Sequence, residues 1–221
     1  MTIEHNRYLM IEQQIRPWDV LDQSILNLLT VVKRENFVPV AYKGLAFADT
    51  EIPLIKDGAA NEHMMPPRVE ARILQELNVK KHERVLEIGA GSGYMAALLA
   101  HRAQEVTTVE INPTLAEIAK LNLAENHISN VKVEVADGAN GFAKGAPYDV
   151  IVISASLPFV PQAFFDQLKV GGRMAVFVGQ APVMEAQLIT RTGEKQFETV
   201  NLFETNVAPL TNAQQLNKFS F

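Results

Sequence analysis

The stretch Arg84–Tyr94, RVLEIGAGSGY, contains the pattern that decides the fold of this chain. It opens as a short apolar run of the kind that forms a buried strand. Three glycines on alternate positions follow, Gly89, Gly91 and Gly93, and the chain resumes as Tyr94–Ala100, an Ala/Leu-rich segment that favours a helix. Glycine permits positive φ and close approach of a ligand, and the first N–H groups of a helix lack partners within it. The stretch therefore predicts a strand–turn–helix cradle for a nucleotide-like ligand.

The spacing of the glycines and two nearby acids indicate which ligand this is. A dinucleotide-binding turn has the pattern G-x-G-x-x-G, whereas this chain has G-x-G-x-G. Glu87, two residues before the first glycine, would repel a pyrophosphate but suits a cationic amino group. Glu110 ends the next predicted strand, at the position that binds a ribose diol in such folds. Together they predict S-adenosyl-L-methionine, which has an ammonium and a sulfonium but no phosphate; the alternatives are NAD, or an ordinary βαβ turn with two surface acids.

The composition sets limits on the class of protein. The chain has 221 residues, 48% of them hydrophobic and 20% charged, as in a soluble globular protein. Its net charge of −5, without a basic block, argues against nucleic acid as a partner. The absence of cysteine excludes disulfides, zinc–thiolate sites and cysteine nucleophiles, and the histidines lack metal-ligand spacing. With no signal-peptide pattern and no apolar run of about 20 residues, we expect a cytoplasmic protein without membrane or metal.

Strands and helices are predicted to alternate after the cradle. Helices are expected over residues 3–15, 25–32, 67–77, 113–126 and 161–168, and strands over 106–110, 131–135, 148–154, 173–178, 185–191 and 198–207. Such alternation predicts an α/β fold with a doubly wound, mostly parallel sheet and a C-terminal antiparallel element. Together with the turn expected to bind S-adenosylmethionine, it predicts a Rossmann-like methyltransferase sheet. We expect a single domain, 1–221, in which an N-terminal helical and loop addition, 1–78, is joined to a cofactor-binding sheet core, 79–221.

Eight segments spread along the chain carry a resemblance to a known family: VVKRENFVP (31–39), DTEIPL (49–54), VLEIGAGSGY (85–94), DG (137–138), APYD (146–149), QLKVGGR (167–173), VG (178–179) and NVAPL (206–210). In this order they resemble the protein-L-isoaspartate O-methyltransferases. The cradle alone would indicate only a methyltransferase, whereas the segments near the two ends indicate this family. The resemblance implies repair of damaged proteins by methylation of isoaspartyl carboxylates, with isoaspartyl peptides or proteins as partners.

One segment departs from the family pattern. Ahead of Pro67, the family carries a Thr-Ile-Ser-x-Pro loop whose serine contacts the substrate carboxylate. This chain has His63 at the threonine position, then Met64, and Met65 at the serine position. A thioether cannot donate a hydrogen bond, and losing one to a charged group costs about 1.5–3 kcal/mol, or roughly one to two decades in rate or binding. A different methyl acceptor and a non-catalytic S-adenosylmethionine-binding protein are therefore the alternative hypotheses.

The predicted site has a cofactor half and an acceptor half. Because two carboxylate oxygens match a vicinal diol, we expect Glu110 to bind the ribose. The cofactor half comprises Glu87, Gly89, Gly91, Ser92, Gly93, Glu110, Ile111, Asp137 and Gly138, in which the last two resemble the family's adenine-edge pair. The acceptor half comprises His63, Met64, Met65, Ser154 and Ser156. Asp137 could instead form an Asx turn, the serines a plain loop, and Met65 an apolar plug over a disused site. A carboxylate nucleophile is already anionic, so alignment and exclusion of water are the chemistry expected.

Overall fold

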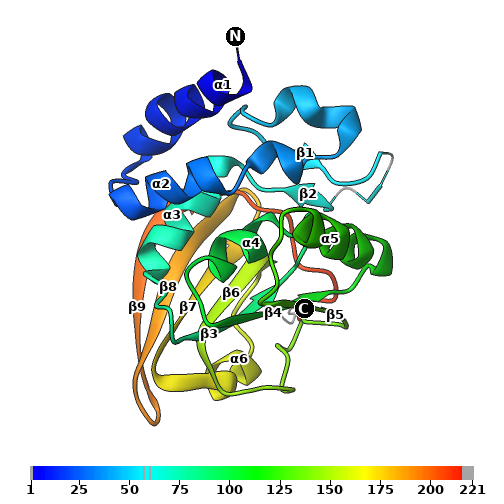
Figure 1. Cartoon of the computed structure of the whole chain (residues 1–221). Helices are drawn as coiled ribbons and strands as arrows, with labels where there is room; N and C mark the ends of the chain where they lie inside the picture. Colours follow the sequence, from blue (N-terminus) through cyan, green and yellow to red (C-terminus); the bar gives the residue numbers. More distant parts are fainter. Residues whose placement is uncertain (1, 57, 60, 216–221) are drawn as a thin grey trace.

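A seven-stranded sheet runs through the computed structural model, which describes residues 2–56, 58–59 and 61–215 (Figure 1). The strand order is β5-β4-β3-β6-β7-β8-β9. The first five strands of this order pair in parallel, and β8 and β9 pair antiparallel. The predicted α/β fold, with a mostly parallel sheet and an antiparallel element at its end, is confirmed. The bounds are β3 Arg84–Ile88, β4 Glu105–Glu110, β5 Val131–Val135, β6 Tyr148–Leu157, β7 Leu168–Gln180, β8 Val183–Gly193 and β9 Gln196–Thr205.

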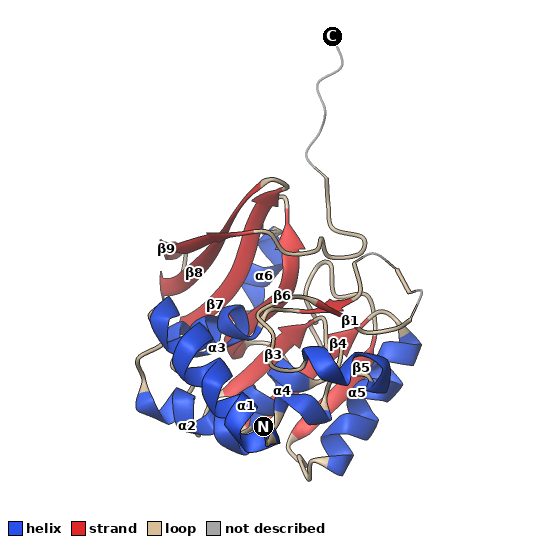
Figure 2. Cartoon of the chain, turned by 90° about the horizontal axis from the view of Figure 1, so that it is seen from above, coloured by secondary structure: helices blue, strands red, loops and turns tan. Residues whose placement is uncertain are grey.

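Alternate side chains of the central strands pack into two separate apolar clusters, one on each face of the sheet. In β6, Val150 and Val152 join the first cluster, whereas Ile151 and Ile153 join the second. The first face is covered by α3 (Pro67–Leu77), α4 (Tyr94–Ala100) and α5 (Pro113–Glu125), and the second by α6 (Gln162–Gln167), as Figure 2 shows. Because both of its faces are buried, the middle of β6, Val150–Ile153, is a continuous apolar run without polar alternation.

The N-terminal addition lies over the face that carries α3 and α4 (Figure 1). The helix expected over 3–15 is α-helical over Ile3–Met10 (α1) and π-helical over Ile11–Ile15. Asp22 caps α2 (Gln23–Val31) by accepting a hydrogen bond from the Ser24 N–H at 2.7 Å. Short 3₁₀ turns follow at Arg34–Asn36 and Val40–Leu45. The addition therefore packs on the core as a helical layer.

Two very short strands in the N-terminal addition were not predicted. β1 (Ile52–Pro53) pairs antiparallel with β2 (His63–Met64), with Ile52 opposite Met64. Two residues are too few to show a strand period, so no sequence pattern indicates this pairing. The pairing fixes the loop that carries Met65 close to the carboxyl ends of the sheet strands.

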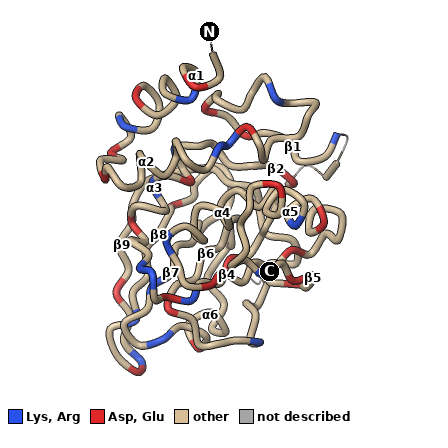
Figure 3. The backbone as a smooth tube through the Cα atoms, viewed as in Figure 1, with Lys and Arg blue, Asp and Glu red and all other residues tan. Residues whose placement is uncertain are grey.

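Charged residues are interspersed along the backbone, as Figure 3 shows. In the part of the chain that the structure describes, no helix is long and apolar enough to cross a membrane. Arg173 on β7 makes four side-chain hydrogen bonds. Its guanidinium donates to both Glu83 carboxylate oxygens at 2.6 and 2.8 Å and to the carbonyls of Leu77 and Asn78 at 2.6 and 3.0 Å. Arg173 thereby ties the end of α3 to the sheet.

We predict that Arg173→Met lowers the free energy of unfolding by about 3 kcal/mol, because it removes the guanidinium that pairs with the Glu83 carboxylate and bonds two carbonyls. Urea unfolding measures this. Arg84→Met is the matched control: its pair with Glu105 spans 3.9 Å and is exposed, so its loss costs less than about 1 kcal/mol. Equal losses in the two variants would contradict the anchoring role of Arg173.

Candidate functional site

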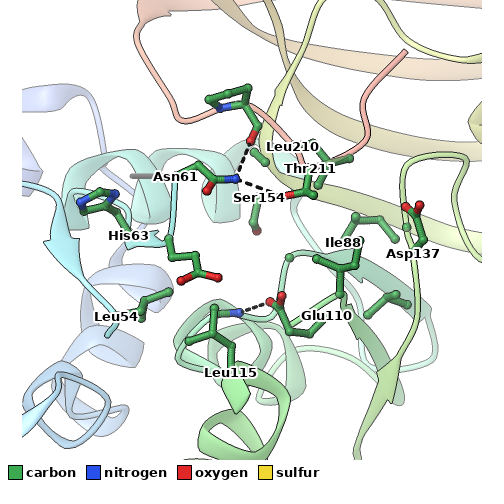
Figure 4. Close-up of a pocket in the computed structure, with 18 residues that line it drawn as sticks. Leu54, Asn61, His63, Ile88, Glu110, Leu115, Asp137, Ser154, Leu210 and Thr211 are labelled. Carbon is green, nitrogen blue, oxygen red and sulfur yellow. Dashed lines mark hydrogen bonds between the residues drawn. The ribbon is translucent and has the colours of Figure 1, made fainter. Parts of the chain in front are cut away.

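Two adjoining cavities lie at the carboxyl ends of β3, β4 and β6, where the strand order of the sheet reverses. Open α/β sheets bind ligands at this switch point. The first cavity encloses about 620 Å³ of empty space, part of it open to solvent. In Figure 4, Glu110, Asp137 and Ile88 of the core face Leu54, Asn61 and His63 of the N-terminal addition across this space. Leu54, His63, Gly89, Gly91 and Ser154 line both cavities.

The glycine turn forms the floor that the two cavities share. Gly89, Gly91 and Gly93 have φ angles of +92°, +51° and +82°, in the region that glycine favours. A Cβ on Gly93 would also lie 3.2 Å from the Ala119 carbonyl of α5, so α5 packs directly on the turn. Ser92 is buried, and its hydroxyl accepts a hydrogen bond from the Tyr94 N–H at 3.3 Å. The turn therefore needs these residue types to begin α4 beside the cavity.

Glu110, at the end of β4, lines the first cavity with the neighbouring Ile111. One carboxylate oxygen accepts from the Gly91 N–H and the other from the Asn112 N–H, each at 3.0 Å. Glu110 is only 6% exposed. Each carboxylate oxygen has a second lone pair, so the fixed group can still accept hydrogen bonds from a ligand. This geometry suits a diol.

Glu87 lines the second cavity and is fully buried. The register of β3 and β4 places Thr108 directly opposite it, and the Thr108 hydroxyl donates to Glu87 at 2.6 Å. The Ser154 hydroxyl donates to the other oxygen at 3.3 Å. Burial raises the pKa of Glu87 to about 8 against the effect of these two hydroxyls. The alternative of two surface acids beside an ordinary turn is therefore wrong.

Asp137 and Gly138 follow β5 and line the first cavity. Asp137 accepts from the Ala139 N–H at 2.9 Å, which is the Asx turn considered from the sequence, and from the Asn212 amide at 2.9 Å. A Cβ on Gly138 would lie 2.6 Å from the Ile88 side chain, so only glycine allows the chain to pass there. Asp137 therefore shapes its own loop and also lines the cavity.

The acceptor half of the predicted site falls mainly on the second cavity. His63, Met64, Met65 and Ser154 line it, and both methionine side chains are buried. His63 also lines the first cavity, and its Nδ1 is buried without a partner among the described residues. The altered loop therefore lies directly across from the glycine turn.

Ser156, which was also predicted for the acceptor half, lines neither cavity. It is buried, and its hydroxyl donates to the Val207 carbonyl at 2.8 Å. Its backbone also pairs with Ala208 and Leu210. The pairing of β6 with β7 shifts register between Val152 and Ser156, so Ser154 and Ser156 do not share one environment. Ser156 fastens the C-terminal segment to the sheet.

Several lining residues had no assigned role in the sequence prediction. They come from the N-terminal addition and the C-terminal segment and are Leu54, Asn61, Glu62, Glu70, Pro209, Leu210 and Thr211. The Asn61 amide donates to the Thr211 hydroxyl at 3.0 Å and joins the two segments across the first cavity (Figure 4). Only the resemblance of NVAPL (206–210) to the family indicated a role for the C-terminal segment, and that resemblance did not place the segment at the cavity.

The charges of the lining indicate what the cavities accept. The first contains the carboxylates of Glu62, Glu110 and Asp137, and the second those of Glu70 and Glu87. Among the described residues, no lysine or arginine lines either cavity. This lining would repel phosphates and suits a cation bearing hydroxyl groups, so it fits S-adenosylmethionine and not NAD. No group of three histidine, aspartate or glutamate side chains in the described ranges could hold a metal ion.

A Rossmann-like sheet with an acid-lined cavity at its switch point defines the class, that of the S-adenosylmethionine-dependent methyltransferases. A family model described as protein-L-isoaspartate(D-aspartate) O-methyltransferase matches residues 5–215. The chain belongs to this family, as its segments from 31–39 to 206–210 predicted.

Individual relatives agree with the family match. The chain is 39% identical over 206 residues to a protein-L-isoaspartate O-methyltransferase of Rhodopseudomonas palustris, covering 93% of each chain. It is 37% identical over 202 residues to one of Methanoculleus marisnigri, covering 91% of this chain and 89% of that one. A solved protein-L-isoaspartate O-methyltransferase superimposes with a TM-score of 0.78 at 27% identity, covering 94% of this chain and 65% of the solved one. A Plasmodium falciparum structure with bound S-adenosyl-L-homocysteine shares the fold, with a TM-score of 0.78 at 18% identity.

Proposed function

We propose that this enzyme transfers the methyl group of S-adenosylmethionine to the carboxylate of isoaspartyl residues in peptides and proteins. The observation that carries the proposal is the extent of the family match, residues 5–215. It includes the N-terminal addition, which supplies Leu54, His63 and Met65 to the cavities, as well as the cofactor turn. The relatives thus favour the family's acceptor over a different one.

The reaction requires alignment of the acceptor carboxylate with the methyl donor, and it requires no general base. The bound cofactor supplies an electrophilic methyl group on a sulfonium. The acceptor carboxylate is already anionic near neutral pH, so the residues of this chain have only to orient it and exclude water. The buried side chains of Leu54, Met64 and Met65 provide an apolar wall opposite the glycine turn. Such a wall keeps water away from the reacting atoms.

We assign the side chains as follows. Glu110 and Ile111 hold the ribose, Glu87 the ammonium group, and Asp137 with Gly138 the adenine edge, while the glycines and Ser92 shape the turn. His63, Met64, Met65 and Ser154 border the acceptor.

Residues 1–78 and 79–221 act as one unit. This proposal is supported by the lining of the first cavity, to which the first range contributes Asn61 and the second contributes Glu110. The cytoplasmic location, and the expectation that neither nucleic acid nor membrane is a partner, stay predictions that cell fractionation and pull-down experiments would test.

Purified protein with labelled S-adenosylmethionine should methylate an isoaspartyl peptide and not the aspartyl peptide of the same sequence. Glu110→Ala should lower kcat/KM at least about tenfold, because hydrogen bonds to a charged group are lost. Glu117→Ala, at an exposed position on α5, is the control and should not change it. Equal labelling of the two peptides, or full activity of Glu110→Ala, would count against the proposal.

Met65→Ser should raise kcat/KM for the isoaspartyl peptide about tenfold or more, because a hydroxyl can donate a hydrogen bond to the acceptor carboxylate. Met64→Ser is the matched control: Met64 is also buried and lines the same cavity, and its replacement should give no gain. Steady-state kinetics with varied peptide concentration measures both. An unchanged rate in Met65→Ser would show that this position does not limit the reaction.

The buried Glu87 makes cofactor binding depend on pH. Its pKa is about 8 in the free protein, so below pH 8 it must lose a proton to pair with an ammonium group. The affinity for S-adenosylhomocysteine, which keeps that ammonium, should therefore rise from pH 6 to 8, by at most about tenfold per pH unit. Calorimetry should show a weaker slope in Glu87→Gln and the wild-type slope in Glu117→Gln. A wild-type slope in Glu87→Gln would refute the contact.

A further inference from the structure

The guanidinium of Arg34 is buried behind residues 63–65, which we call the acceptor loop. Arg34, on the turn Arg34–Asn36 of the N-terminal addition, is 0% exposed. One guanidinium nitrogen donates to the Met65 carbonyl at 2.6 Å, and the other pairs with the carboxylate of Glu70 on α3. The guanidinium carbon lies 5.1 Å from the centre of the Tyr94 ring, at the start of α4. Arg34 therefore contacts the acceptor loop, α3 and the helix that follows the glycine turn.

Stability alone does not account for this arrangement. A buried ion pair gains little over apolar residues of the same size, because desolvating both charges offsets their attraction. Glu70 also lies in the wall of the second cavity, with Met65 and Glu87. Burial raises the pKa of Glu70 to about 7, and the charge of Arg34 opposes that rise. The pair thus places a guanidinium and a carboxyl group, both buried, beside the cavity in which residues 63–65 face the glycine turn.

We propose that Arg34 and Glu70 are positioning residues for the methyl acceptor: Glu70 orients the guanidinium of Arg34, and Arg34 holds the Met65 carbonyl so that residues 63–65 keep their place opposite the glycine turn. The inference rests on the proposed function for the identity of the acceptor. A planar guanidinium can hold two partners in fixed directions, whereas an ammonium group cannot impose the same geometry. Neither residue takes part in methyl transfer directly.

The test compares two double variants. Arg34→Met/Glu70→Met removes the pair and substitutes apolar side chains, a change that buried ion pairs often tolerate. Arg7→Met/Glu35→Met is the matched control, because this pair is also nearly buried, includes the residue next to Arg34 and lines neither cavity. The measurements are the KM for an isoaspartyl peptide, the Kd for S-adenosylhomocysteine, and amide hydrogen exchange over residues 62–65.

We expect the Arg34/Glu70 variant to raise the peptide KM and to speed exchange over residues 62–65 about tenfold, with the Kd for S-adenosylhomocysteine within about twofold of wild type. The control should leave all three unchanged. If the double variant does not fold, Arg34→Lys takes its place. It should raise the peptide KM and speed exchange by less than the double variant, because lysine keeps the charge but lacks the planar guanidinium that holds two partners.

An unchanged KM with unchanged loop exchange would overturn the inference. So would equal losses of peptide and S-adenosylhomocysteine binding, since these would indicate a general loss of structure. If the wild-type protein methylates no isoaspartyl peptide, the proposed function fails. In that case hydrogen exchange still decides whether Arg34 and Glu70 hold the loop, because that measurement needs no acceptor.

Discussion

The site depends on a carboxylate buried without a basic residue beside it in the cavity wall. Glu87 is fully buried, and its hydrogen-bond partners are the hydroxyls of Thr108 and Ser154. Hydroxyls satisfy a carboxylate only in part, so burial still raises its pKa to about 8. The parallel register of β3 and β4 creates this environment by placing Thr108 opposite Glu87. The sheet therefore places a buried carboxyl group in the cavity wall, where pairing with a cation would favour its ionised form.

The cavity walls come from segments that are far apart in the sequence. The sheet and the glycine turn supply Glu87, Glu110 and Asp137, and the N-terminal addition supplies the loop that carries Met65. Arg34 links that loop to the start of α4 through buried contacts. The loop that carries Met65 and the helix that follows the glycine turn are thus joined through the interior of the protein as well as across the cavity.

The sequence predicted the parts of the molecule that local patterns specify. The apolar runs gave the central strands, and the glycine spacing with Glu110 at a strand end gave the turn and the acid beside it. It did not predict the β1–β2 pair, which is too short to have a period, or the Arg34–Glu70 pair, which joins residues 36 apart. It also did not predict that Ser156 bonds to the C-terminal segment, because a register shift between β6 and β7 gives Ser156 a different environment from Ser154. These features depend on tertiary contacts that no single stretch of sequence encodes.

The attachment of the C-terminal segment to Ser156 has a consequence for biosynthesis. One wall of the first cavity is formed by Pro209, Leu210 and Thr211. Hydrogen bonds to Ser156 and Asn61 hold this segment in place. The lining of the first cavity is therefore complete only after residues 209–211 have been synthesised and have paired with Ser156 and Asn61.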